Sequence, residues 1–212
     1  MQSFLARLNQ TLSRPIGPGP RLLVVASALL LVAVYIFPLW NLTMFAPQYQ
    51  EGLRLDIYSY KLEGGNRDQD IKEINILNHY IGMRDLVADD FTEFKWLPFI
   101  VGALGLLYLR AAVMGTVGGV LDVLVLNIYF SAFALWSFGY RMYIYGHTLA
   151  PTAAVKVDPF MPPMFGAKQL ANFEVYSYPQ AASYAMALSS LLLVAALVVA
   201  WRQLSSEGKK SP

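Results

Sequence analysis

The chain contains no cysteine and few charged residues. Of its 212 residues, 56% are hydrophobic and 14% are charged, whereas about 25% charged residues are typical of a soluble domain. The absence of cysteine excludes disulfides, zinc–thiolate and iron–sulfur sites, covalent c-type haem and a cysteine nucleophile. The formal net charge of +2 is too small to indicate nucleic-acid binding. The apolar residues occur in long runs, which is typical of an integral membrane protein in a lipid bilayer.

Four apolar runs are long enough to be transmembrane helices, and we expect these helices at 22–40, 96–114, 117–138 and 184–201. The first run has nineteen residues without a charge. That is about 28 Å of helix, which is close to the thickness of the hydrocarbon core of a bilayer. Its length and its ending, Phe37-Pro38-Leu39-Trp40, argue against a cleaved signal peptide, which ends in small residues.

The second and third runs are joined by Gly115 to Gly119, and this Gly-Thr-Val-Gly-Gly sequence predicts a tight turn. Asp122 lies near this turn in the third run, where we expect a structural ion pair with Arg110 or Arg202. Polar residues deeper in the runs predict contacts between helices. Hydrogen bonds to neighbouring helices are expected from Asn127, Ser189 and Ser190.

Basic residues predict the orientation of the four spans. The tails 1–21 and 202–212, together with the end of the second run and the turn that follows it, hold seven bases and one acid. The loop 41–95 holds six bases and ten acids, and the loop 139–183 holds three bases and two acids. Because basic flanking segments stay in the cytoplasm, we expect both termini inside and both long loops outside. The seven bases are Arg7, Arg14, Arg21, Arg110, Arg202, Lys209 and Lys210.

The first long loop has local structure of its own. Alternating apolar and polar residues at 53–57 predict a short strand. The sequence Asp-Ile-Lys-Glu at 70–73 is similar to a capping box and predicts an amphipathic helix that ends at Gly82. Asp89–Asp90 is expected to cap the helix that leads into the second span. We therefore expect an all-α membrane protein with four transmembrane helices and two extracytoplasmic loops, the first with a short strand and an amphipathic helix.

Both histidines of the chain fall in the two long loops, together with methionines. His79 and Met83 are four residues apart, a spacing that places both side chains on one face of a helix. His147 precedes a proline-rich stretch in which Met161 and Met164 form a Met-x-x-Met pattern. Imidazole and thioether ligands suit copper, and Cu(I) in particular. One hypothesis is that these five residues form a copper site outside the membrane.

Other hypotheses assign these residues and loops different roles. The histidines and methionines are equally explained by loop hydrogen bonds and gap filling. The aromatic residues of the loops suit a protein interface. We expect no enzyme, because Walker A, Gly-x-Ser-x-Gly, His-Glu-x-x-His and dinucleotide motifs are absent, and spans without deep charges argue against a transporter. The interface aromatics would be Tyr58, Tyr60, Tyr80, Phe91, Phe94, Tyr140, Tyr143 and Tyr145.

The two loops resemble a poorly characterised family of small bacterial membrane proteins that is associated with accessory loci of copper enzymes, such as nitrous-oxide reductase or respiratory oxidases. The most specific element is Asn-His-Tyr-Ile-Gly-Met at 78–83. The resemblance implies an inner-membrane accessory protein that binds or relays copper on its periplasmic face for assembly of a respiratory cuproenzyme. The alternative is a non-metal structural subunit that docks a respiratory membrane complex. The matching stretches are 46–49, 51–53, 63–65, 74–83, 159–166 and 171–173.

Overall fold

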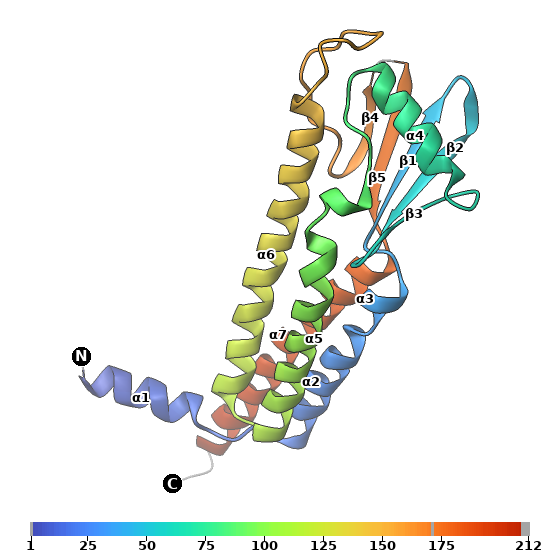
Figure 1. Ribbon diagram of the computed structural model, residues 1–212. Coiled ribbons are helices and arrows are strands. Elements are labelled where there is room, and N and C mark those ends of the chain that lie inside the picture. The colour runs from blue at the N-terminus through green and yellow to red at the C-terminus, as the bar shows by residue number, and fades with distance from the viewer. Residues whose placement is uncertain (1, 171, 209–212) are drawn as a thin grey trace. The chain divides into compact units, whose positions relative to one another are not determined.

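The computed structural model describes residues 2–170 and 172–208 (Figure 1). Three residues used in the sequence analysis, Ala171, Lys209 and Lys210, lie outside this part of the chain. The described residues form α-helices and five strands, and the strands belong to one antiparallel sheet. The prediction of an all-α protein is therefore wrong, and the fold is mixed α/β.

The chain divides into two compact units. The first unit comprises Met1–Ala33, Phe99–Ser131 and Tyr184–Pro212, and it is helical. The second unit comprises Val34–Pro98 and Ala132–Ser183, and it contains the sheet. Each unit is thus assembled from chain segments that are far apart in the sequence.

Four helices are long and apolar enough to cross a membrane, which fits a multi-pass membrane protein. The first candidate span, Pro18–Ile36, consists of α2 and the short α3. The third is α6, whose 31 residues extend over about 46 Å and exceed the roughly 30 Å hydrocarbon core. The helices are α1 (Gln2–Leu12), α2 (Pro18–Leu30), α3 (Ala33–Ile36), α5 (Glu93–Met114), α6 (Val117–His147) and α7 (Ala181–Gly208).

The predicted turn between the second and third spans is confirmed, since α5 ends at Met114 and α6 begins at Val117. Gly115 has a φ of +61°, and a Cβ there would lie 2.1 Å from the Arg21 guanidinium. The positive φ therefore favours glycine at this position. Arg21 in turn donates from Nη1 to the Val113 carbonyl at 3.3 Å, which satisfies the end of α5.

Polar side chains join the spans inside the first unit. The hydroxyls of Ser27 on α2 and Ser189 on α7 lie 2.7 Å apart, and each lies within hydrogen-bond distance of the other's backbone carbonyl, at 2.7 and 2.9 Å. Asn127 Nδ2 donates to Ser190 Oγ at 2.6 Å, which confirms the predicted bonds between helices. These contacts fix which helix faces meet, because an unpaired polar group in lipid is costly.

The predicted ion pair of Asp122 is not formed. Asp122 is exposed on α6, and the ion pairs among the described residues join neither Arg110 nor Arg202 to it. Its place near the start of the helix explains how it avoids burial, because the first turns of a span lie near water.

The sheet has the strand order β3-β2-β1-β5-β4. β1 is central and pairs antiparallel with β2 from the same loop and with β5 from the other long loop. The two long loops therefore fold into one sheet. The strands are β1 (Trp40–Ala46), β2 (Tyr49–Ile57), β3 (Leu62–Gly64), β4 (Gly166–Leu170) and β5 (Phe173–Pro179).

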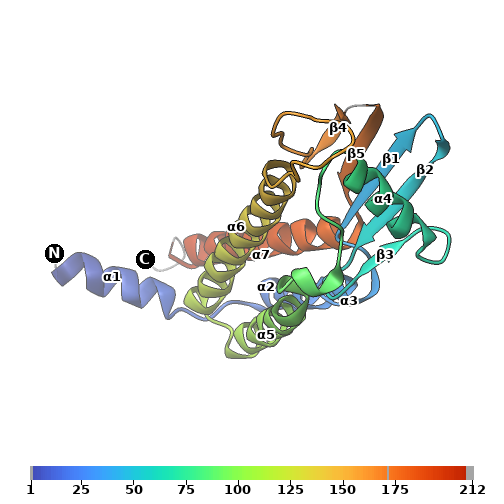
Figure 2. The same ribbon diagram turned by 45° about the horizontal axis from the view of Figure 1, so that its top comes forward.

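One face of the sheet is covered by α4 (Gln69–Tyr80), as Figures 1 and 2 show. The core is formed by every second residue of the strands and by residues three or four positions apart on the helix. The expected strand at 53–57 and the helix that follows are both present. The buried core residues are Leu42, Met44, Ala46, Leu53, Leu55, Ile74, Leu77, Ile81, Leu170, Phe173 and Val175.

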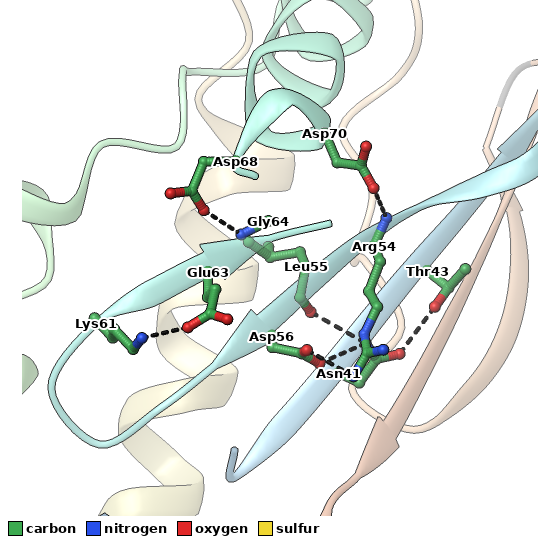
Figure 3. Close-up of polar contacts among 10 residues, drawn as sticks. All are labelled: Asn41, Thr43, Arg54, Leu55, Asp56, Lys61, Glu63, Gly64, Asp68 and Asp70. Atoms are coloured by element: carbon green, nitrogen blue, oxygen red, sulfur yellow. Dashed lines mark hydrogen bonds and ion pairs between the residues drawn. The ribbon is translucent and has the colours of Figure 1, made fainter. Parts of the chain in front are cut away.

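The start of α4 differs from the predicted capping box. Asp68 occupies the N-cap position with a φ of +66° and makes no side-chain capping bond. Asp70 instead turns back to the sheet, where its Oδ2 accepts a hydrogen bond from the Arg54 amide at 2.9 Å (Figure 3). Asn66 Nδ2 donates to the other carboxylate oxygen at 2.8 Å. The carboxylate thus ties the helix to β2 rather than satisfying the first turn.

Candidate functional site

The structure brings together the chain segments that carry the two histidines. α4 ends beside the stretch that follows α6, and both belong to the second unit. The Ala150 amide donates to the Gly82 carbonyl at 2.7 Å, and the Val155 amide donates to the Tyr80 carbonyl at 3.0 Å. These two bonds hold the C-terminal end of α4 against the loop after His147.

His147 is exposed at the last residue of α6. Its ring stacks on Tyr143, with 3.8 Å between the ring centroids. Its Nδ1 lies 2.9 Å from the Tyr143 carbonyl oxygen. Because a carbonyl only accepts, the proton is assigned to Nδ1, which leaves Nε2 as the free acceptor.

His79 and Met83 have different surroundings. His79 is exposed on α4. Gly82 has a φ of +80° and ends the helix as predicted, so Met83 lies beyond the helical path. Met83 is partly buried and packs against the core between α4 and the sheet. The helical geometry assumed for this pair is therefore absent.

Met161 and Met164 lie in the proline-rich stretch before β4. Lys168 Nζ donates to the Met161 carbonyl at 2.8 Å. A Cβ at Gly139 on α6 would lie 3.0 Å from the Met164 sulfur, so this thioether packs where the helix has no side chain. Ser177 Oγ donates to the Met164 carbonyl at 3.0 Å. Met164 thus serves to hold the stretch on α6.

The five residues of the copper hypothesis have different surroundings, and the hypothesis stays a prediction. Two imidazoles are exposed, and the Met83 and Met164 side chains are engaged in packing. Among the described residues, no group of three or more His, Asp or Glu side chains lies close enough to hold a metal ion.

A pocket of about 180 Å³ lies beside these segments. Its walls come from the end of α4, the proline-rich stretch and β4. Apolar side chains predominate, and Asp158 and Lys168 add one charge of each sign. The lining residues are Ile81, Val157, Asp158, Phe160, Lys168, Gln169 and Leu170.

The sheet face opposite α4 carries a polar network (Figure 3). Asn41 Nδ2 donates to Asp56 Oδ1 at 2.8 Å, and Thr43 Oγ1 donates to Asn41 Oδ1 at 2.9 Å. Arg54 pairs with Asp56 at 2.8 Å and keeps 60% of its side chain exposed. These groups satisfy one another, so they leave no unpaired charge for catalysis.

An ion pair clamps α5 to α6 within the second unit. Arg141 Nε and Nη2 each donate at 3.1 Å to a different oxygen of Glu93, and Ser137 Oγ donates to Glu93 at 2.7 Å. The side chains are 25% and 19% exposed. This bidentate geometry fixes the level along α6 at which α5 begins.

An exposed row of rings follows α6, and we name it the aromatic stripe: Phe133, Trp136, Tyr140, Tyr143 and His147. The residues are spaced by three and four positions, so they share one helix face. Consecutive rings mostly touch, with 5.7 Å between the first two centroids, 5.6 Å between the next two and 3.8 Å between the last two. Trp136 is 61% exposed, and Tyr140 and Tyr143 are 52% and 50% exposed.

Sequence reasoning found only part of this surface. Tyr140 and Tyr143 belong to the predicted interface aromatics, whereas Tyr145 is buried at 6% exposure. The spacing of 133, 136, 140, 143 and 147 is visible in the sequence. The sequence prediction ends the third span at 138, and this boundary divides the stripe between a span and a loop.

Comparison of the chain with protein-family models, with curated proteins and with solved structures finds no match.

Proposed function

We propose that this chain is a membrane-anchored docking subunit that binds a helical membrane partner, as in the assembly of a respiratory complex. The observation that carries the proposal is the exposure of the aromatic stripe on α6. Spacing by three and four residues is the pattern by which one helix packs against another. Tyrosine and tryptophan are also the residues enriched in the buried centres of protein interfaces.

The membrane alone does not account for the stripe. Aromatic residues form a belt where a span meets the headgroups, and Trp136 and Phe133, which contacts Trp96, fit such a belt. Arg141, however, is level with Glu93, the first residue of α5. On this proposal Tyr143 lies beyond the first residue of the neighbouring helix α5 and outside the lipid tails. A protein partner explains the exposure of this outer half.

We propose the following orientation and location. The chain resides in the inner membrane of a bacterium with both termini in the cytoplasm, as the seven bases of the tails and turn indicate. The loops that form the sheet then face the periplasm. No reaction is assigned, because the polar groups of the sheet network are mutually satisfied.

The docking proposal is tested by purification of the tagged, full-length protein from its native membrane in mild detergent. We expect a membrane complex to co-purify with the unaltered chain. The double substitution Tyr140→Ser and Tyr143→Ser removes two rings from the outer half of the stripe, and we expect recovery of the complex to fall at least several-fold.

Phe165→Ser is the matched control, because Phe165 is 69% exposed and lies outside the stripe. Both variants are first compared with the unaltered chain by thermal unfolding, so that loss of fold is separated from loss of docking. Equal recovery of the complex with the stripe variant and the control variant would contradict the proposal.

Copper binding is the second candidate function, and one observation favours it. The Nδ1 of His147 is committed to the Tyr143 carbonyl, and this arrangement is common for metal-binding histidines because it presents Nε2. The backbone bonds between the Tyr80–Gly82 and Ala150–Val155 segments hold the stretch bearing His79 beside the one bearing His147. The two imidazoles would supply the ligands, and Cu(I) accepts such soft and nitrogen donors.

Competition with a chromophoric Cu(I) chelator tests this candidate on the purified protein. We expect about one Cu(I) per chain, and strong weakening in His79→Ala combined with His147→Ala. Met83→Leu and Met164→Leu serve as controls, because their side chains pack against protein. Absence of Cu(I) binding by the unaltered protein would remove copper from its function.

A further inference from the structure

Helix α1 is amphipathic and its apolar face is uncovered. Phe4, Leu5 and Leu8 are 67%, 55% and 45% exposed. In a helix of 3.6 residues per turn these three share one face with Leu12, and Gln10 lies opposite. Three large apolar side chains without cover on an 11-residue helix indicate a surface that is buried against something else.

The C-terminal end of α1 is fixed at one end of the first unit. The Ile16 amide donates to the Gly115 carbonyl at 2.8 Å, and the Val117 amide donates to the Arg14 carbonyl at 3.1 Å. The linker after α1 thus forms a short antiparallel contact with the α5–α6 turn. Since that turn joins two spans, it lies where the spans leave the membrane.

The other chain end of the unit lies at the same place. A Cβ on Gly17 would come within 2.9 Å of the Gln203 side chain near the end of α7. Five residues separate α1 from the first span, and α1 leads sideways away from the helices of its own unit (Figures 1 and 2). A helix held at this level and directed away from the bundle has the geometry expected of a helix at a membrane surface.

We propose that α1 is an interfacial helix that buries Phe4, Leu5 and Leu8 at the boundary between headgroups and acyl chains. The occupant of this apolar face is the lipid of the leaflet that the termini share. An amphipathic helix in this position typically sinks its apolar face a few ångströms below the phosphates and keeps its polar face in water. Arg7 lies outside the apolar arc, where a cation contacts lipid phosphates.

The absence of cysteine from the chain allows a direct test on the full-length protein. Leu8→Cys and Gln10→Cys each receive one nitroxide label, and the protein is reconstituted into vesicles of phosphatidylcholine with a minor share of phosphatidylglycerol. Power-saturation electron paramagnetic resonance then measures accessibility to oxygen, which concentrates in lipid, and to a nickel chelate, which stays in water. We expect the oxygen-to-nickel ratio at Leu8→Cys to exceed that at Gln10→Cys several-fold.

Two results would overturn the proposal. Equal and high nickel accessibility at both positions would show that the helix lies in water. Spin–spin broadening at Leu8→Cys that is lost when unlabelled protein is added in excess would show that a second copy covers the face. Both substitutions lie on an exposed helix outside the bundle, so a change in accessibility reports position rather than loss of fold.

Discussion

At the scale of single residues, Glu93 and Arg141 form a bidentate ion pair in the second unit. Glu93→Gln keeps the shape of the side chain but leaves the guanidinium opposite a neutral amide. Because both side chains are mostly buried, we expect a loss of about 2 kcal/mol in the free energy of unfolding. Thermal or denaturant unfolding in detergent micelles measures it.

The pair of Lys61 and Glu63 supplies the control for this prediction. It is also an ion pair, but its side chains are 41% and 44% exposed. Exposed pairs contribute little, because water and salt screen them. Lys61→Met is therefore expected to leave the free energy of unfolding nearly unchanged. An equal loss of stability in Lys61→Met and Glu93→Gln would show that burial does not set the contribution of an ion pair.

A second residue-scale prediction concerns Glu73 on α4. The hydroxyl of Tyr49 donates to its carboxylate, and this bond, with one from Gln69, holds the pKa of Glu73 below its ordinary value. A lowered pKa in the folded state stabilises the protein above pH 4.5, and the contribution is lost as the pH falls through the folded pKa. Tyr49→Phe removes the bond, so we expect the pKa of Glu73 to rise.

Carbon-13 NMR titration of the Glu73 carboxyl measures this shift. Tyr176→Phe is a matched control, because the Tyr176 hydroxyl donates to Glu174 rather than to Glu73. An unchanged pKa of Glu73 in Tyr49→Phe would show that the hydrogen bond does not control the ionisation.

At the scale of helices and strands, the sequence predicts β2 but not the other strands of the sheet. Leu53, Leu55 and Ile57 alternate with polar residues, and β2 lies there. β1 also alternates, but it follows the first apolar run directly and Trp40 was assigned to the end of the span. β4 reads Gly-Ala-Lys-Gln-Leu, which has no alternation of its own. Its pairing with β5 creates the strand, and that pairing is a tertiary contact.

The candidate site, like the sheet, can be predicted only in part from the sequence. The two histidines and their loops could be selected from residue type alone, and the hydrogen bonds near Tyr80 and Gly82 do bring these loops together. The methionines could not be assigned, because thioether groups are equally suited to a metal and to a packing gap. Only the fold reveals that the Met164 thioether packs at Gly139, where the helix has no side chain.

Two glycines of α6 provide the element-scale prediction. A Cβ on Gly146 would lie 1.8 Å from the Phe160 carbonyl oxygen, and backbone does not move easily. Gly146→Ala is therefore expected to push the proline-rich stretch off the helix. Trypsin should then cleave faster at Lys156 and Lys168, both of which are exposed, as measured by the rate of fragment formation.

Gly139→Ala is the matched control for the Gly146 substitution. Its Cβ would meet the Met164 sulfur at 3.0 Å, and the end of a methionine side chain adapts at small cost. We expect cleavage at nearly the rate of the unaltered protein. Similar rates for both variants would show that the stretch is not held by close approach to Gly146.

At the scale of the whole molecule, the chain crosses between its two units several times, and the sheet is complete only when β5 joins β1. β5 follows the third candidate span and β1 follows the first. Both connections must therefore emerge on the same side of the membrane. The sheet therefore requires that the chain cross the membrane an even number of times between β1 and β5. This inference does not depend on the distribution of basic residues.

The orientation of the chain gives the last prediction. Thr152 lies in the loop after α6, and Ser13 lies between α1 and α2; both are exposed. We expect Thr152→Cys to react with a membrane-impermeant maleimide on intact spheroplasts, and Ser13→Cys to react only after permeabilisation, because the basic tails stay inside. The unaltered protein has no cysteine and serves as the blank. Labelling of Ser13→Cys alone on intact spheroplasts would invert the orientation, and labelling of both would mean that the sheet and α1 lie on one side.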